Sequence, residues 1–294
     1  MPFRLLLASG VLALAACAGD SASVDHAGAS ATESEVRGDA VVAPAPTAGR
    51  AARGLALLTA FRDSLPAHSG NALRCTSCHL DNGTRARAMS WIGSTSRYPK
   101  FRRRPGYEES LARRVNECIA RSLAGKMLPE DSPEMRDMLA YIATLDSPAK
   151  PVAVDTVKLQ GNATRGAADY GTSCARCHGA AGQGVNSVAP AVGGPESYSI
   201  GAGMARQNTL ATFLLHNMPF DGTDTLTAQR AADIAAYVLT MARQDHPGKE
   251  RDWPRGDPPA DVAYATTAAE RLGKPAPPAR ALLPRRVSPD SLLP

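Results

Sequence analysis

Two short motifs in this chain have the residue types and spacing for covalent haem attachment. Each contains two cysteines separated by two residues, and a histidine follows the second cysteine directly: Cys75, Cys78 and His79 in the first motif, and Cys174, Cys177 and His178 in the second. Two thiols at this spacing can bond the two vinyl groups of one haem, while the adjacent imidazole reaches the iron. The sequence therefore predicts two covalently bound haem c groups, with His79 and His178 as iron ligands.

The same cysteine pairs could instead form a zinc site or a redox-active dithiol. A zinc ribbon brings two such pairs together, but the two histidines here lie 99 residues apart along the chain. A thioredoxin-like dithiol requires neither a second copy nor the histidine. Haem attachment is therefore the better interpretation of both motifs.

Each iron needs a sixth ligand, and the second motif has a clear candidate. Met218 stands directly before Pro219, 40 residues after His178. A distal methionine together with a histidine is a common ligand pair in cytochromes c and raises the reduction potential. We expect Met218 to be this ligand, although His216 is an alternative and buried methionines are common in cores.

The first motif has two candidates for its sixth ligand. Met127 is separated from Pro129 by one residue, whereas Cys118 lies 39 residues after His79. A thiolate ligand would lower the reduction potential. An unpaired cysteine outside the cell is a liability unless it has a function. We expect Cys118 to bind the iron; in the alternative, Met127 does so and Cys118 is a small buried residue.

The N-terminus predicts export and a lipid anchor. Arg4 precedes an apolar run over residues 5–16, which is too short to span a bilayer and is typical of a signal peptide. The run ends in Leu14-Ala15-Ala16-Cys17, which resembles the bacterial lipobox, whose cysteine carries lipid in the mature protein. We expect a protein anchored through Cys17 on the periplasmic side of a bacterial membrane; an ordinary signal peptide is the alternative.

The fold class expected is mainly α, with two tandem class I cytochrome c domains, a disordered N-terminal tether and a Pro-rich C-terminal tail. Apolar residues recur at helical spacing over 138–145 and 234–241, after Pro129 and Pro219, and strand signals are scarce. The predicted segments are a lipoprotein signal peptide (1–16), a flexible tether (17–49), a first cytochrome domain (50–147), a linker (148–157), a second cytochrome domain (158–244) and a Pro-rich tail (245–294). We expect the tail to wrap the second domain.

The bulk composition is compatible with this organisation. The chain has 294 residues, of which 44% are hydrophobic and only 5% aromatic, so haem could supply much of the flat apolar surface of the cores. The formal net charge of +5 is modest. No aromatic-plus-basic module for nucleic acid is visible, and we expect no nucleic-acid partner.

Several stretches of the first domain resemble the dihaem thiosulfate dehydrogenases, which form tetrathionate and are related to SoxA-type cytochromes. They are residues 75–84, 91–93, 97–99, 114–122 and 128–135; the resemblance is close over about 73–141 and continues loosely to 251–254. It implies that the first haem is the active site, with His and Cys ligands. It also implies that a His/Met haem passes electrons to an external partner such as a soluble cytochrome. Asn217 before Met218 and the short chain after Gly179 depart from the pattern.

The resemblance also implies a substrate, thiosulfate or a related small sulfur anion, and residues that contact it. Eight arginines lie between the first haem motif and Cys118, and guanidinium groups bind oxyanions in bidentate fashion. From the family pattern, Arg104, Arg114 and Ser122 are expected to contact the oxyanion beside Cys118. The alternative for any one arginine is a solvated loop or a contact with a haem propionate.

Three functions fit these patterns. The first is an oxidoreductase acting on sulfur compounds, which Cys118 and the arginines favour. The second is a membrane-tethered dihaem electron carrier with no catalysis, which leaves Cys118 unexplained. The third is a subunit that works only within a sulfur-oxidising complex.

Overall fold

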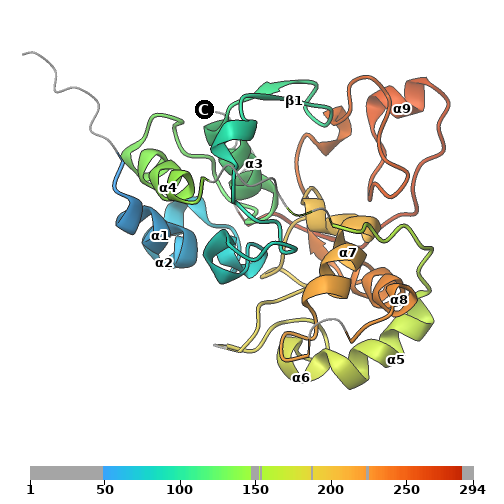
Figure 1. Ribbon diagram of the computed structural model, residues 1–294. Coiled ribbons are helices and arrows are strands. Elements are labelled where there is room, and N and C mark those ends of the chain that lie inside the picture. The colour runs from blue at the N-terminus through green and yellow to red at the C-terminus, as the bar shows by residue number, and fades with distance from the viewer. Residues whose placement is uncertain (1–48, 147–151, 153, 187, 223–224, 287–294) are drawn as a thin grey trace, which may run out of the picture. The chain divides into compact units, whose positions relative to one another are not determined.

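The computed structural model describes residues 49–146, 152, 154–186, 188–222 and 225–286. The predicted signal peptide, Cys17 and nearly all of the tether lie outside these residues, as do half of the predicted linker and residues 287–294. Helices connected by loops make up most of the described chain (Figure 1). None of the helices described is both long and apolar enough to cross a membrane.

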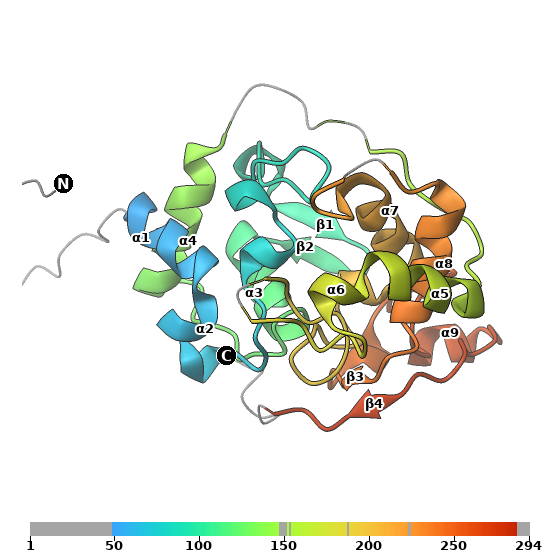
Figure 2. The ribbon, with the colours of Figure 1, turned by 90° about the horizontal axis from the view of Figure 1, so that it is seen from below.

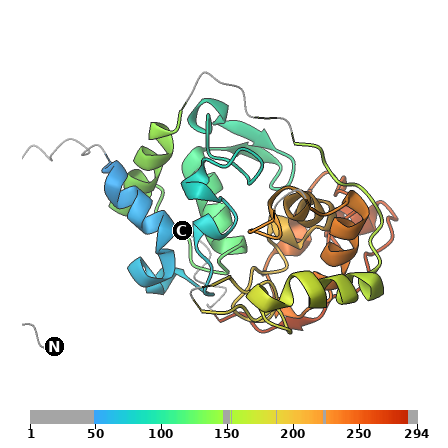
Figure 3. The same cartoon turned by 60° about the horizontal axis from the view of Figure 1, so that its bottom comes forward.

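The first domain is built on two helices that pack against each other. Helix α1 (Ala51–Thr59) lies beside α4 (Pro133–Thr144), as Figures 1 and 3 show. Between them in the sequence come α2 (Phe61–Ser64), α3 (Leu111–Arg121) and the 3₁₀ turns Pro66–His68, Cys75–Ser77, Asp81–Gly83 and Thr95–Arg97. The apolar faces of α1 and α4 bury Leu58, Met138 and Ile142, which places the core of this domain between the two helices.

The second domain repeats this arrangement. Helix α5 (Ala163–Ser173) packs on α8 (Ala228–Val238), and α7 (Gln207–Asn217) packs on the other side of α8. The short helix α6 (Ala175–His178) contains Cys177 and His178 of the second haem motif, with Cys174 directly before it, and the 3₁₀ turn Gly203–Ala205 precedes α7. Ile234, Ala235 and Leu210 are buried among these helices.

A glycine allows close helix contact in both domains. A Cβ atom added to Gly54 of α1 would lie 1.9 Å from the backbone oxygen of Asp137 in α4. A Cβ atom added to Gly166 of α5 would lie 1.9 Å from the backbone oxygen of Asp233 in α8. No side chain fits at either crossing, so the two helix pairs approach each other in the same way.

The residue before each glycine forms an ion pair across the same crossing. Arg53 contacts the Asp137 carboxylate at 2.7 Å, and Arg165 contacts the Asp233 carboxylate at 2.7 Å. Both aspartates are buried, and each also accepts a hydrogen bond from the backbone N–H at the start of the facing helix. Both domains therefore have the same contact, in which an arginine and the following glycine of the first helix meet an aspartate of the last helix. This contact fixes how α1 lies against α4 and how α5 lies against α8.

Short strands and the C-terminal segment complete the described chain. Strands β1 (Lys100–Arg102) and β2 (Tyr107–Glu109) form an antiparallel hairpin, whereas β3 (Arg243–Gln244) and β4 (Leu282–Leu283) pair in parallel (Figure 2). The chain between β3 and β4 contains the turn Lys249–Arg251 and helix α9 (Thr267–Arg271). The C-terminal segment contacts the first domain as well as the second: Arg285, which follows β4, donates to the backbone oxygens of Ala120 in α3 and of Gly125 beyond it.

Gly166→Ala should destabilise the second domain, because its methyl group would collide with the backbone of α8. Gly171 provides a matched control on the same helix, since no atom lies within 4 Å of a Cβ added there. We expect Gly166→Ala to lower the free energy of unfolding by about 1–3 kcal/mol and Gly171→Ala to raise it by about 0.5–1 kcal/mol. Urea unfolding of the haem-loaded protein measures both; equal stabilities would contradict this account of the crossing.

Candidate active site

Both motif histidines are oriented as iron ligands would be. The Nδ1 atom of His79 lies 2.5 Å from the backbone oxygen of Met89, and the Nδ1 atom of His178 lies 2.8 Å from that of Pro190. A hydrogen bond at Nδ1 leaves Nε2 free to bind a metal. Burial lowers the pKa of His79 to about 4, so its imidazole is neutral at neutral pH. The described part of the chain contains no group of three or more His, Cys, Asp or Glu side chains arranged to hold a metal ion by themselves.

A large cavity adjoins the second motif and fits a haem. Its volume is about 880 Å³, within the usual range for cofactor pockets. Cys174, Cys177 and His178 line it, and so does Met218, whereas His216 does not. The rest of the wall is largely apolar and includes Leu210, Leu214, Ile234 and Val238. The residues present therefore suit a covalently bound haem, and Met218 brings a thioether to the same cavity.

The first motif places its sulfurs near Cys118. Burial raises the pKa of the Cys75 and Cys78 thiols, and a charge on the Cys118 sulfur raises both further. The indole of Trp91 packs on the His79 ring with 4.8 Å between centroids. The Cys118 sulfur is thus within electrostatic reach of the haem attachment site.

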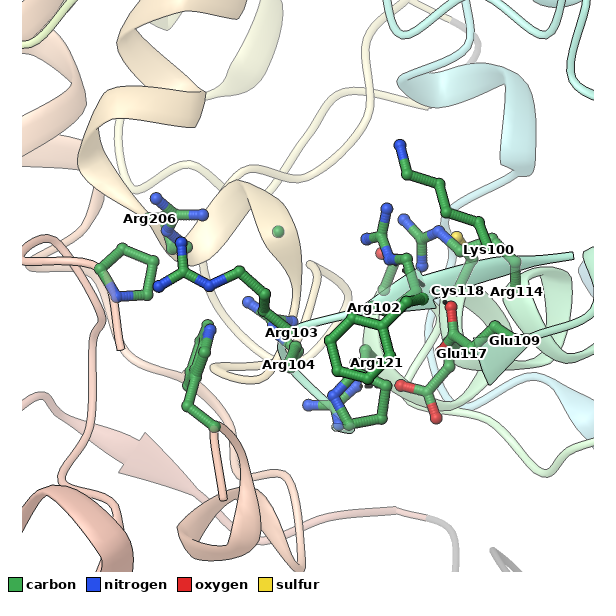
Figure 4. Close-up of a pocket in the computed structure, with 16 residues that line it drawn as sticks. Lys100, Arg102, Arg103, Arg104, Glu109, Arg114, Glu117, Cys118, Arg121 and Arg206 are labelled. Carbon is green, nitrogen blue, oxygen red and sulfur yellow. Dashed lines mark hydrogen bonds and ion pairs between the residues drawn. The ribbon is translucent and has the colours of Figure 1, made fainter. Parts of the chain in front are cut away.

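A second, smaller cavity of about 390 Å³ opens beside Cys118 (Figure 4). All four residues predicted to act on substrate line it: Cys118, Arg104, Arg114 and Ser122. Met127 is not among its lining residues. The other lining side chains come from the β1–β2 hairpin, from α3, from the second domain and from the C-terminal segment: Lys100, Phe101, Arg102, Arg103, Pro105, Glu109, Glu117, Arg121, Arg206, Trp253 and Pro259.

Helix α3 supplies one wall of this cavity through its helical spacing. Arg114, Cys118 and Ser122 are separated by four residues each, so they follow one face of the helix. Ser110 begins the helix by accepting a hydrogen bond from the backbone N–H of Arg113, which is a usual helix N-cap. The sequence pattern alone thus aligns the thiol with an arginine and a hydroxyl.

Arg114 is a cation that is available to a ligand. Its guanidinium makes no hydrogen bond or ion pair with a side chain of the described residues, and it faces the cavity on the same side as Cys118 (Figure 4). A charge on the Cys118 sulfur raises the pKa of Arg114, an effect larger than the opposing effect of burial. Arg114 and Cys118 are therefore electrostatically coupled, with the hydrogen-bonding capacity of the guanidinium unused.

Arg121 is held by two buried carboxylates. Its guanidinium contacts both oxygens of Asp252 at 2.8 Å and Glu117 at 2.5 Å. The hydroxyl of Tyr264 donates to Asp252 at 2.5 Å. Burial lowers the pKa of Arg121, but the two carboxylates outweigh that effect and the net shift is upward. The sequence analysis did not single out Arg121, although it lies seven residues after Arg114 and hence on the same side of the helix.

Arg104 is held in place from outside its own domain. Its guanidinium lies over the indole of Trp253, 4.7 Å from the ring centroid, and donates to the backbone oxygen of Gly201 at 2.8 Å. The backbone N–H of Trp253 in turn donates to the backbone oxygen of Arg104 at 2.7 Å. The C-terminal segment thereby sets the position of a predicted oxyanion contact.

Arg206 belongs to the second domain, yet it lines the same cavity. It lies across the cavity from Cys118 and Arg114 (Figure 4) and forms a two-point contact with Asp261. No local motif in the sequence indicates this role, because Arg206 and Asp261 are brought to the site only by tertiary folding. The sequence therefore gives no indication that Arg206 belongs to the site.

Comparisons with known proteins identify both domains as cytochromes. Residues 67–150 match the family model described as "SoxA/TsdA, cytochrome c domain", and residues 161–238 match "Cytochrome C oxidase, cbb3-type, subunit III". The chain is therefore a protein of two cytochrome c domains, which bind haem c covalently, and this part of the predicted fold class is confirmed.

Full-length relatives define the family. The chain is 39% identical to thiosulfate dehydrogenase of Psychrobacter arcticus, over 71% of this chain and 68% of the relative. It is 36% identical to that of Allochromatium vinosum, over 65% and 77%. A solved structure of thiosulfate dehydrogenase (TsdBA) from Marichromatium purpuratum matches with a TM-score of 0.64 at 32% identity, covering 67% of this chain but only 47% of that chain.

The chain belongs to the thiosulfate dehydrogenase family and is an oxidoreductase. The resemblance noted in the first domain is confirmed.

Trp253→Ala should weaken oxyanion binding, because it removes the ring that holds the Arg104 guanidinium at the cavity. A cation–π contact contributes about 0.5–2 kcal/mol, so the dissociation constant of sulfate should rise about twofold to thirtyfold. Isothermal titration calorimetry of the haem-loaded protein measures it. Trp253→Phe keeps a ring under Arg104 and should recover most of the affinity; if it binds as weakly as Trp253→Ala, the contact does not position Arg104.

Proposed function

We propose that this protein oxidises two thiosulfate ions to one tetrathionate ion in the cavity beside Cys118, releasing two electrons to an external acceptor. The observation that carries the proposal is the placement of Cys118 in a cavity lined by seven cationic side chains. The relatives in Psychrobacter and Allochromatium are both named thiosulfate dehydrogenase, which supports thiosulfate as the substrate.

The charge of the cavity meets the main difficulty of this reaction. Two dianions must approach until a sulfur–sulfur bond can form, and their repulsion is large in a medium of reduced dielectric. The unpartnered guanidinium of Arg114 offers bidentate hydrogen bonds beside Cys118, and Arg104 adds a second cation held by Trp253. Fixed guanidinium groups therefore offset the repulsion at the place where the two anions meet.

The residues that would hold the haems lie close to one another. In this proposal His79 and Cys118 bind the first iron, and His178 and Met218 bind the second. Thr76 and Ser77, between the two cysteines of the first motif, line the cavity of the second haem. When bound, the two haems supply one-electron acceptors between the cavity beside Cys118 and the external partner.

The larger cavity, at the second haem motif, has an exposed apolar rim that suits an external redox partner. Val188 and Phe220 line this cavity and are 64% and 59% exposed, and Val185 is also exposed. Arg176 and Asp221 form an exposed ion pair at the same rim. A soluble cytochrome could contact such a surface without burying unpaired charge.

The finer organisation of the chain is part of the same proposal. The shared Arg-Gly and Asp crossings support two tandem class I domains, 50–147 and 158–244. A signal peptide over 1–16 and a lipid on Cys17 would hold the enzyme on the periplasmic side of the membrane through the 17–49 tether.

Cys118→Ala should alter the first haem and abolish the reaction. Loss of a thiolate ligand should change the absorption spectrum and raise the reduction potential of that haem. Thiosulfate-dependent reduction of ferricyanide should fall about a hundredfold or more. Met127→Ala is the matched control, and we expect it to leave the spectrum, potential and rate near those of the unaltered protein.

The reverse pattern would contradict this assignment. If Met127→Ala changes the first haem and Cys118→Ala does not, Met127 is the ligand. If the unaltered protein reduces both haems with a chemical reductant but does not oxidise thiosulfate, it is an electron carrier.

Met218→Ala should lower the reduction potential of the second haem, because a thioether ligand favours the reduced iron. His216→Ala provides the control, two residues before Met218 in the last turn of α7; the Nε2 atom of His216 lies 3.3 Å from the backbone oxygen of Asp155. Redox titration followed by absorption spectroscopy separates the two haems. A potential that responds to His216→Ala and not to Met218→Ala would reverse the assignment.

A further inference from the structure

Glu109 is an unexpected residue in a cavity that receives anions. It is the last residue of β2, its side chain is only 2% exposed, and it lines the cavity together with Cys118 and Arg114. Figure 4 shows it on the same side of the cavity as Arg114. A carboxylate at this place would repel the sulfur oxyanions that the surrounding guanidinium groups attract.

The hydrogen bonding of Glu109 sets it apart from the other acidic residues of the site. Its Oε2 atom is buried and has no hydrogen-bond partner, and neither carboxyl oxygen accepts a hydrogen bond from a described residue. The nearest cation, the Nε atom of Arg102, is 3.6 Å from Oε2, which is too long for a hydrogen bond. By contrast, Glu117 is paired with Arg121 at 2.5 Å.

The charged groups around Glu109 shift its pKa in opposite directions. Lys100 and Arg102 face it from β1, and Arg114, Glu117 and Arg121 face it from α3. Burial raises the pKa of Glu109, and Glu117 adds to that rise, whereas Arg114, Arg102 and Arg121 oppose it; the net shift is upward. A buried carboxyl group without hydrogen-bond donors favours its neutral form.

We infer that Glu109 takes up a proton when an oxyanion enters the cavity, and that the protonated carboxyl group donates a hydrogen bond to the bound anion. The inference extends the proposed function by assigning a proton to the substrate complex. A bound dianion favours the protonated form of Glu109, because protonation removes the negative charge of the carboxylate next to the charge of the dianion. Anion binding and proton uptake are therefore coupled.

The sign of the pH dependence follows from this coupling. Below the pKa that Glu109 has in the free protein, the group is already protonated and affinity does not change with pH. Above that pKa, each anion must bring one proton with it, so affinity falls by up to about tenfold per pH unit. The fall ends above the pKa of Glu109 in the complex, where the carboxylate stays ionised.

Proton uptake can be measured directly with the intact, haem-loaded protein. Sulfate is a suitable probe, because it is a tetrahedral dianion that this enzyme cannot couple oxidatively. Calorimetric titration in two buffers of different ionisation enthalpy, repeated between pH 5 and 8, gives the number of protons bound per sulfate. We expect this number to approach one within part of that range, and uptake near zero throughout would overturn the inference.

Glu109→Gln identifies the group that takes up the proton. It keeps the shape and a hydrogen-bond donor but cannot ionise, so sulfate affinity should become nearly independent of pH and exceed that of the unaltered protein at pH 8. Glu108→Gln is the matched control, since Glu108 is the exposed neighbour on the same strand, and it should retain normal uptake. Unchanged uptake in Glu109→Gln would assign the proton to another group and overturn the inference.

These experiments test the proposed reaction and the role of Glu109 independently of each other. If sulfate binds with proton uptake that depends on Glu109 but thiosulfate is not oxidised, the assigned reaction is wrong while the role of Glu109 stands. If thiosulfate is oxidised and its KM shows the same pH dependence in Glu109→Gln as in the unaltered protein, the role of Glu109 is wrong while the reaction stands. The absorption spectra of both haems confirm that each variant is folded.

Discussion

Keeping positive charge at the surface of a partly enclosed cavity is the physical constraint on which this structure depends. Burying guanidinium groups without counter-charge is costly. Two of the compensating carboxylates stand behind the cations: Asp252 pairs with Arg121 and Asp261 with Arg206, and neither aspartate lines the cavity, whereas Glu117, the other partner of Arg121, does. The cations are thus stabilised from the protein side while their other side remains open to a ligand.

This arrangement explains why the cavity is assembled from distant parts of the chain. Helix α3 cannot supply both the cations and all their counter-charges from one face, since only residues three or four positions apart meet on a helix. Glu117 fills one such position for Arg121. The other carboxylates come from the segment after the second domain, which also places Trp253 against Arg104. The cytochrome fold supplies a haem site, and the additional segment holds the arginines of the neighbouring cavity in place.

Local patterns in the sequence were enough to predict much of this. The haem motifs occupy five consecutive residues each, so their chemistry can be recognised without a fold, and the two cytochrome c domains are confirmed. Arg114 and Ser122 were expected from family resemblance, and their spacing of four residues on either side of Cys118 explains why they share a face of α3 with it. Arg104 was proposed from family resemblance, and the structure places it at the same cavity.

The remaining site residues could not be predicted, because long-range packing alone selects them. Arg206 and Asp252 resemble any other charged residue in the sequence. They belong to the site only because they pair with residues 55 and 131 positions away in the chain. Glu109 is a glutamate in a short, weakly patterned strand, and only its burial without a hydrogen bond distinguishes it. The C-terminal segment was expected to lie on the second domain, whereas it also contacts helix α3.

The pairing of Arg121 with two carboxylates has a consequence for biosynthesis. A nascent chain emerges from its N-terminus, so helix α3 can form well before residue 252 has been synthesised. During that interval Glu117, one helical turn away, is the partner within reach of the guanidinium. The early, local ion pair would keep Arg121 compensated, and the late, distant one would close the wall of the cavity only when the last part of the chain arrives.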